Sequence, residues 1–258
     1  MSWTVEVLHY ATGQVPGAQV TFLDGYEAWQ EFHFHVFLLR DGDHVVLLDT
    51  GIDDLTPFNR MLEPVLGERG LLRPAGEGVT VRSLLAERDL APEDVDFVAL
   101  SHLHIDHAAN VPMFTDAKFL MSREGYERHK DLERRVPEMV PDPVFPAAAI
   151  EFLEQPGRDR LQLLPDGETG LPGLTIKYLG GHTADCAAYV AETENGDVIF
   201  PSDTAWTLRN LRDHHPPGSV VDIAQSYEAF TWLDGLEGTV LPPHEAGLAD
   251  VLAGNAAG

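Results

Sequence analysis

The sequence has a single cysteine, Cys186, so no disulfide can form within the chain. It is also poor in basic residues, with 17 Lys and Arg against 42 Asp and Glu, and its formal net charge is -25. A field of that sign repels a phosphate backbone, so no nucleic-acid substrate is expected. No apolar run reaches the length of a membrane span, and residues 1–4 lack the character of a signal peptide. These absences predict a cytoplasmic protein without a membrane partner.

The apolar pattern alternates between strands and helices along the chain. Strands are expected at residues 5–8, 32–39, 45–48, 95–100, 161–164, 174–179, 187–191, 198–200 and 239–241. Helices are expected at residues 57–66, 81–87, 123–132, 147–153 and 223–233. Without repeats or linkers, this pattern predicts one α/β domain over residues 1–258, with sheets inside and helices outside.

Two features of this pattern concern a possible pocket. Residues 123–160 include the Pro-rich stretch 136–146 and are the candidate for a lid or pocket wall, since long irregular insertions are often functional. His33 and His35 share one face of an expected strand and are predicted to be half-exposed.

The most informative motif is Ser-His-Leu-His-Ile-Asp-His at residues 101–107. It places three imidazoles and one carboxylate within six positions, directly after an apolar strand. Imidazole and carboxylate groups are the ligands that zinc and similar divalent ions prefer. At the end of a strand, His102 and His104 would point the same way, because strand side chains repeat every two residues. Asp106 and His107 would lie on the following turn, free to reach a second metal.

Three later residues stand in a similar context, each at a break after an apolar strand. They are His182, Asp203 and His244. The glycines before His182 let the backbone turn there. Each residue alone could simply cap a strand, but the recurrence of the same context favours function. Together with the first motif, they supply three ligands per metal and one bridging residue.

These motifs resemble the signature of the metallo-β-lactamase superfamily. The resemblance covers residues 102–107, Gly181-His182-Thr183, Asp203 and His244, and Asp49-Thr50-Gly51 is similar to an early strand-end motif of the superfamily. It implies an αββα sandwich with the site at one edge between the sheets. It also implies two divalent ions that share a hydroxide, with zinc as the first expectation and iron, manganese or cobalt as alternatives.

The same resemblance implies a role for each motif residue. One metal would be held by His102, His104 and His182. The second would be held by Asp106, His107 and His244. Asp203 would bridge the two ions, and Asp49 would orient a ligand histidine.

Within the superfamily, the ligand set is similar to that of glyoxalase-II-like thioesterases and of acyl-homoserine-lactone lactonases, which act in quorum quenching. The size and spacings look closest to the lactonases. The leading hypothesis is a dinuclear hydrolase that opens a lactone ring, in which Asp203 or Asp106 passes a proton to the departing alkoxide. The alternatives are a thioesterase, a hydrolase of another ester or lactone, and a metal-dependent binding protein without catalysis. A homodimer is a further expectation.

The chain departs from the lactonase pattern at three places. Trp206 stands where such lactonases typically have tyrosine, Ala184-Asp185-Cys186 replaces Pro-Gly-His, and the segment between His107 and His182 is longer. These departures leave the substrate open. The residues with weak claims to contact it are Ile105, Trp206, Phe230 and Trp232, each of which could equally pack in the core.

Overall fold

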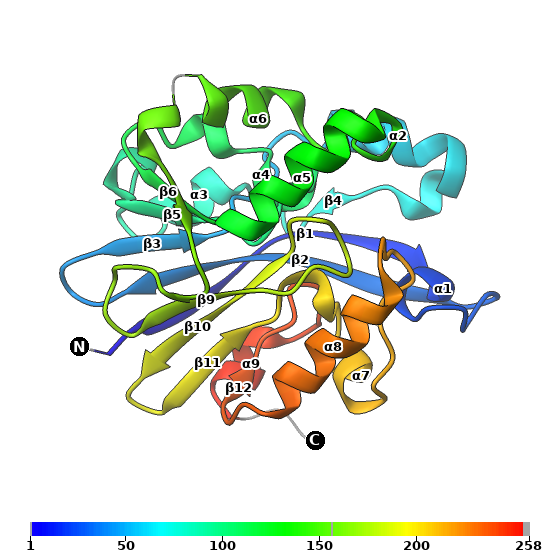
Figure 1. Ribbon diagram of the computed structural model, residues 1–258. Coiled ribbons are helices and arrows are strands. Elements are labelled where there is room, and N and C mark those ends of the chain that lie inside the picture. The colour runs from blue at the N-terminus through cyan, green and yellow to red at the C-terminus, as the bar shows by residue number, and fades with distance from the viewer. Residues whose placement is uncertain (1, 156, 255–258) are drawn as a thin grey trace.

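The computed structural model describes residues 2–155 and 157–254, and it consists of two sheets with helices on their outer faces (Figure 1). Within these residues, the larger sheet has seven strands in the order β4 (Arg73–Pro74), β1 (Thr4–Pro16), β2 (Trp29–Arg40), β3 (Val45–Leu48), β5 (Phe97–Ala99), β6 (Lys118–Ser122) and β7 (Leu161–Leu164). In the same residues, the smaller sheet has five strands in the order β12 (Thr239–Val240), β11 (Gly196–Phe200), β10 (Ala187–Thr193), β9 (Leu174–Tyr178) and β8 (Gly167–Glu168). The predicted αββα sandwich in one domain is confirmed.

The longer helices cover the two sheets from outside (Figure 1). On the side of the larger sheet lie α2 (Thr56–Leu66), α3 (Val81–Ala86), α5 (Arg123–Arg135) and α6 (Ala147–Glu154), and α8 (Ile223–Asp234) lies on the smaller sheet. The connections contain the short helices α1 (Gly17–Val20), α4 (Ile105–Ala108), α7 (Leu208–Arg212) and α9 (Leu248–Leu252). They also contain 3-10 turns at Glu68–Gly70, Pro92–Asp94, Val111–Met113, Pro137–Met139, Arg158–Arg160 and Ser202–Thr204. Within the described ranges, no helix is both long and apolar enough to cross a membrane.

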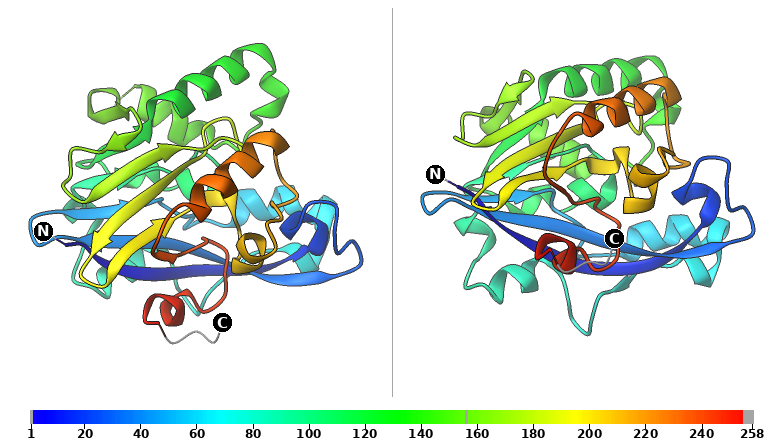
Figure 2. Two further views of the ribbon diagram at one scale, coloured as in Figure 1. Left: turned by 60° about the horizontal axis from the view of Figure 1, so that its bottom comes forward. Right: turned by 90° about the horizontal axis from the view of Figure 1, so that it is seen from below.

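Strand β2 shows how the apolar sequence creates two cores. Its residues are apolar at both odd and even positions, and strand side chains alternate between the faces of a sheet. Val36 and Leu38 pack toward the helices, whereas Phe37 and Leu39 pack between the sheets. The view from below shows these two sheets as separate layers (Figure 2). The core between the sheets fixes their relative position, and the loops at their edge are positioned accordingly.

The sequence did not predict several short elements, among them β6. Its run Lys-Phe-Leu-Met-Ser lies between β5 and β7, and four of its five residues are buried. A short apolar run does not by itself distinguish a strand from a buried loop or helix. Parallel pairing with β5 and β7 decides the conformation, and that pairing involves residues far apart in the chain.

The predicted exposure of His35 is wrong. Only 5% of its surface is exposed, and its Nδ1 lies 2.8 Å from the carbonyl oxygen of Pro243. The loop before His244 covers this part of β2, which the strand pattern alone does not indicate. His33, two residues earlier, is half-buried as expected.

Tyr189 on β10 ties the smaller sheet to the larger one. The residue is fully buried, and its hydroxyl lies 3.2 Å from the carbonyl oxygen of Leu100 and 3.0 Å from that of Leu120. We expect Tyr189→Phe to lower the free energy of unfolding by about 1–2 kcal/mol, because buried carbonyls lose their donor. Urea denaturation measures this change, and an unaltered midpoint and slope would show that the hydroxyl contributes nothing.

Candidate metal centre

The ends of four strands bring the sequence motifs together. Strands β9 and β11 are both antiparallel to β10, and β12 is parallel to β11. Their carboxyl ends therefore lie at the same edge of the smaller sheet. The loops that follow them carry His182, Asp203 and His244, and they meet the loop after β5 in the larger sheet.

Four side chains form the first ligand group: His102, His104, His182 and Asp203. One ligand atom from each lies within 4.8 Å of the others. His182 Nε2 is central, at 2.9 Å from His104 Nδ1 and 3.2 Å from Asp203 Oδ2. His102 Nε2 lies 4.0 Å from the same carboxylate oxygen.

The second ligand group contains Asp106, His107, Asp203 and His244. His107 Nε2 lies 3.4 Å from Asp106 Oδ2 and 3.3 Å from Asp203 Oδ1. His244 Nε2 lies 3.6 Å and 3.2 Å from the same two oxygens. Asp203 thus turns Oδ2 toward the first group and Oδ1 toward the second, so all seven expected ligand side chains lie in two groups that share one carboxylate.

Buried polar atoms at this site fit a pair of cations. Among the described residues, His102 Nε2, His107 Nε2 and Asp203 Oδ1 have no hydrogen-bond partner, although all three are buried. Buried polar atoms in folded proteins nearly always have a partner. A divalent cation in each group would supply one, and imidazole with carboxylate is a donor set that zinc accepts.

The electrostatics of the first group favour neutral imidazoles. Burial lowers the pKa of His102 well below its ordinary value and also lowers the pKa of His182. Burial, followed by the neighbouring His182, lowers the pKa of His104 to about 3. A histidine must be neutral to bind a metal, so these three rings are ready to do so across the physiological pH range.

In the second group, the carboxylates together have the largest influence on the pKa of His107. Burial lowers the pKa of His107, but Asp106, Asp203 and Asp49 together raise it well above its ordinary value. Burial raises the pKa of Asp203, yet the surrounding histidines hold it well below the usual range. A cation that enters this group therefore competes with a proton on His107.

Asp49 orients His107 from behind. Its backbone has φ 59°, a left-handed conformation that is uncommon for any residue except glycine. Its Oδ2 lies 2.8 Å from His107 Nδ1, and its two oxygens accept hydrogen bonds from the backbone N–H and hydroxyl of Ser101, both at 2.8 Å. Because Asp49 engages Nδ1, Nε2 is the nitrogen that faces Asp106 and Asp203.

Backbone carbonyls orient two further ligands, His182 and His244. The sequence predicted these two histidines but not the carbonyls that orient them. His182 Nδ1 lies 2.6 Å from the carbonyl oxygen of Ser219, and His244 Nδ1 lies 2.8 Å from that of His33. Each contact turns the Nε2 of the ring toward the ligand groups. Any residue can offer a carbonyl, so no sequence signal could have marked these positions.

Trp206 contacts the shared carboxylate directly. Its indole N–H donates to Asp203 Oδ2 at 2.8 Å, and its ring lies against His182 and His244, at centroid distances of 6.0 Å and 5.7 Å. The only donor of this side chain is therefore engaged by Asp203.

A cavity of about 420 Å³ opens onto the two ligand groups. Ile105 and Trp206 line it, and Val144 from the segment 123–160 forms part of the wall. Helix α2, which sequence analysis did not assign to the site, contributes an apolar wall made of Phe58, Met61, Leu62 and Leu66. None of the α2 residues is fully buried, because the cavity lies beside its apolar face.

Phe230 and Trp232 do not line this cavity in the described part of the chain, so the expectation that they contact substrate is wrong. Both belong to α8 and pack with Ile199 on the outer face of the smaller sheet. Their spacing on α8 serves helix-to-sheet packing, the alternative that the sequence left open.

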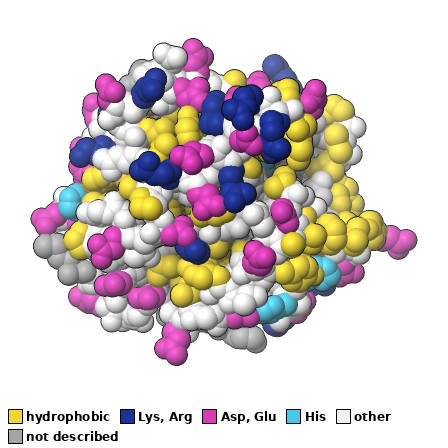
Figure 3. Space-filling model, in the orientation of Figure 1, with side chains coloured by type: hydrophobic (Ala, Val, Ile, Leu, Met, Phe, Trp, Pro, Cys, Tyr) yellow, Lys and Arg dark blue, Asp and Glu magenta, His cyan; other side chains and the backbone are white. Residues whose placement is uncertain are grey.

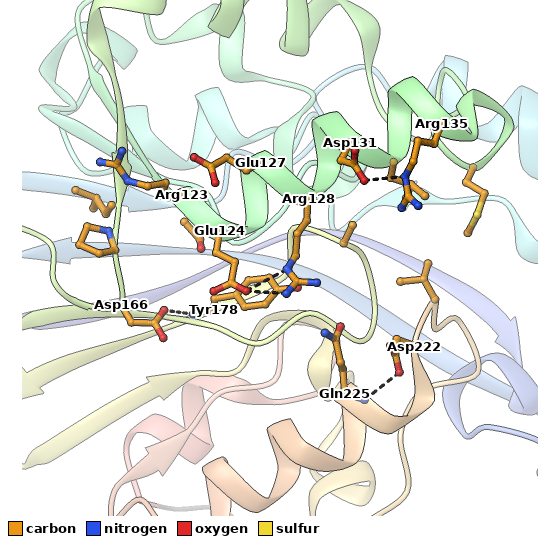
Figure 4. Close-up of a pocket in the computed structure, with 17 residues that line it drawn as sticks. Arg123, Glu124, Glu127, Arg128, Asp131, Arg135, Asp166, Tyr178, Asp222 and Gln225 are labelled. Atoms are coloured by element: carbon orange, nitrogen blue, oxygen red, sulfur yellow. Dashed lines mark hydrogen bonds and ion pairs between the residues drawn. The ribbon is translucent and has the colours of Figure 1, made fainter.

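A larger hollow, of about 990 Å³, lies outside the ligand groups between α5, β9 and α8 (Figure 4). Figure 3 shows Lys and Arg side chains over α5 with acidic side chains between them. Glu124 pairs with Arg128 at 2.8 Å, and Asp131 with Arg135 at 2.7 Å. These opposite charges neutralise one another, so this part of the groove does not favour a phosphate backbone.

The model of the Metallo-beta-lactamase superfamily matches residues 33–244. An N-acyl homoserine lactonase of Bacillus cereus is 26% identical over 182 residues, which cover 70% of this chain and 67% of that protein.

Solved structures share the fold. An N-acyl homoserine lactone hydrolase, with the product N-hexanoyl-L-homoserine bound at its catalytic metal center, has a TM-score of 0.71 at 19% identity, over 96% of this chain and 95% of that one. A probable metal-dependent hydrolase from Staphylococcus aureus has a TM-score of 0.74 at 15% identity, over 95% and 90% of the two chains.

Proposed function

The chain belongs to the metallo-β-lactamase superfamily, and we propose that it is a metal-dependent hydrolase that opens lactone rings, with an N-acyl homoserine lactone as the first candidate substrate. The observation that carries this proposal is the shared carboxylate of Asp203 between two histidine groups, at the floor of an apolar cavity. The lactonase of Bacillus cereus supports the choice of substrate.

The residues of the site have distinct tasks in this proposal. His102, His104 and His182 would hold one divalent cation, Asp106, His107 and His244 a second, and Asp203 would bind both. When bound, such cations, zinc first among them, supply a nucleophile derived from water at neutral pH and polarise a substrate carbonyl.

Proton delivery falls to Asp106 in this scheme. Its side chain is 12% exposed, whereas that of Asp203 is 3% exposed and also accepts a hydrogen bond from Trp206. Ring opening adds the oxygen of water to the acyl carbon and breaks the ring C–O bond. The proton that the attacking water loses must reach the departing alkoxide, and Asp106 Oδ2 is the more accessible of the two carboxylates for taking it from the one and giving it to the other.

The shape of the cavity is suited to an acylated ring. Its volume is within the range of pockets that enclose small ligands. The polar floor would hold the lactone, and the apolar wall of Phe58, Met61 and Leu62 would cover an acyl chain. Trp206 stands beside the reacting end, where its indole restricts the room for the ring.

Proton release in a weakly buffered solution tests the proposal. Metal-replete protein would be given homoserine lactones of several acyl lengths, simple γ- and δ-lactones and a glutathione thioester, beside protein treated with a chelator. We expect rapid acid release from the homoserine lactones, its loss after chelation, and its return when zinc is added.

The other outcomes of this panel are equally informative. If the protein releases no acid from homoserine lactones but hydrolyses another lactone or the thioester, the proposed substrate is wrong and the assignment as a hydrolase stands. No turnover of any compound by protein that binds metal would contradict the hydrolase and favour a ligand-binding protein.

A further inference from the structure

Asp185 lies behind the first ligand group and has no role in the proposed chemistry. It stands in the sequence Ala184-Asp185-Cys186, in the same loop between β9 and β10 that carries His182. Its side chain is completely buried, and Oδ2 accepts a hydrogen bond from the backbone N–H of Leu103 at 2.7 Å. Leu103 is the residue between His102 and His104. The carboxylate of Asp185 therefore joins the two loops that supply the three histidines of the first group.

A second bond joins the same loops. The backbone N–H of Ala187 donates to the carbonyl oxygen of Ser101 at 2.9 Å. With this bond and the bond from Leu103 to Asp185, the two loops are held at two points on the same side of the ligands. The distance between the rings of His104 and His182 depends on this attachment, because each ring projects from one of the two loops.

The other oxygen of Asp185 faces His129 on α5. Asp185 Oδ1 lies 3.8 Å from His129 Nδ1, both side chains are fully buried, and neither that oxygen nor either ring nitrogen has a hydrogen-bond partner among the described residues. A buried acid beside a buried imidazole is costly unless the two interact, directly or through one water. The pair therefore indicates a specific contact between α5 and the metal loop.

The residues on the buried side of helix α5 allow this contact. Figure 4 shows Glu124, Arg128 and Asp131 on the groove side of the helix. Gly125 and His129, one turn apart, are buried on the other side. A Cβ at Gly125 would lie 2.6 Å from the carbonyl oxygen of Asp185, so only glycine lets the helix approach the loop this closely.

Phe145 links the same histidine to the ligands along a second path. Its ring lies 5.2 Å from that of His129 and 4.7 Å from that of His104, measured between centroids. The neighbouring carbonyl oxygen of Val144 accepts a hydrogen bond from the backbone N–H of Ile105 at 2.8 Å. The segment 123–160 is thus attached to the ligand loops on two sides.

We propose that Asp185 is a positioning residue, held by His129, which fixes the separation of His102 and His104 from His182 and so sets the affinity of the first group for its cation. This inference rests on the metal site of the proposed function and deepens it. It does not depend on which ester the protein hydrolyses. It also assigns a role to the segment 123–160, whose residues His129 and Phe145 pack against Asp185 and His104 and so support the first ligand group.

Cobalt binding to the metal-free protein tests the proposal without any substrate. Visible absorption follows the filling of each group, and His104→Ala and His244→Ala provide reference spectra for loss of the first and the second group. We expect Asp185→Ala to bind the first-group cobalt about 10–100-fold more weakly, with a spectrum like that of His104→Ala at limiting cobalt. Asp185→Asn should restore most of the affinity, because its amide oxygen can still accept from Leu103.

Two further variants separate positioning from general stability. Thr169→Val removes a buried hydrogen bond, which the Thr169 hydroxyl donates to the carbonyl oxygen of Leu174 at the opposite end of β9 from the loop of His182, and it should bind both cobalt ions like the wild type. If Asp185→Ala does not fold, His129→Leu provides the test instead. This variant keeps the hydrogen bond from Leu103 to Asp185, and it should lower the cobalt affinity of the first group alone.

Wild-type affinity in both Asp185→Ala and His129→Leu would overturn the proposal. So would parallel weakening of both groups, since that reports only a less stable fold. A wild-type protein that binds no cobalt would refute the metal site and this inference together. A wild-type protein that binds two cobalt ions but hydrolyses no ester would refute the proposed function and leave the role of Asp185 intact.

Discussion

Asp203→Asn is expected to lower kcat by at least about a thousandfold on whichever lactone the wild-type protein hydrolyses. The carboxylate presents one oxygen to His182 and the other to His107 and His244, so both ligand groups depend on it. An asparagine would offer one oxygen and one amide N–H₂, which cannot bind a cation. A loss of about 4 kcal/mol of transition-state stabilisation corresponds to that ratio.

Steady-state kinetics and the metal content of the purified variant measure this effect. Asp213→Asn serves as the matched control, because Asp213 is a surface acid paired with Arg209 and Arg212. We expect that variant to keep wild-type activity. If Asp203→Asn kept more than a tenth of the activity with two ions bound, the shared carboxylate would not be essential.

Asp49→Asn should have the second largest effect. The buried carboxylate accepts hydrogen bonds from Ser101 and lies 2.8 Å from His107 Nδ1. The amide group must turn its N–H₂ toward at least one of these donors, which disturbs the orientation of the His107 ring. We expect a reduction of about 10–100-fold in metal affinity or in activity, as is usual for residues that orient a metal ligand. Asparagine tolerates φ 59°, so backbone strain is not the cause.

Activity measured against the concentration of added zinc separates the two components of this effect. A variant that recovers at high zinc has lost affinity, whereas one that saturates at low activity has a misplaced His107. Asp53→Asn is a useful control, because Asp53 also lies after β3 but contacts Asn110 and the backbone of Val81 instead. Equal effects in both variants would mean that the loop is merely sensitive to substitution.

The local pattern predicted a domain of alternating strands and helices and selected the ligand residues, whereas the two-sheet sandwich and the division of the ligands into two groups came from the resemblance to the superfamily. Apolar strands of period two predict where the chain turns at a sheet edge, and ligand residues directly after such strands must meet there. His182, Asp203 and His244 could be selected in this way, one loop at a time. The structure brings these three side chains together with residues of the 102–107 motif in the two ligand groups.

Other parts of the site could not be predicted because they depend on contacts between distant segments. The carbonyl of Ser219 orients His182 only because the loop before α8 passes over it. Helix α2 looks from its sequence like an ordinary amphipathic helix, and only the fold places its apolar face beside the ligands. Asp185 stood out as a departure from the lactonase pattern, but its partner His129 is visible only in three dimensions.

The distribution of ligands along the chain has a consequence for biosynthesis. His102 to His107 come from the larger sheet, while His182, Asp203 and His244 follow strands of the smaller sheet. A nascent chain on the ribosome cannot complete either ligand group until Asp203 has been made, and the second group also waits for His244. In the proposed metal site, loading would therefore be a late maturation step that follows the docking of the two sheets. The cations available at that moment, and not residue type alone, would then decide which ion the mature protein carries.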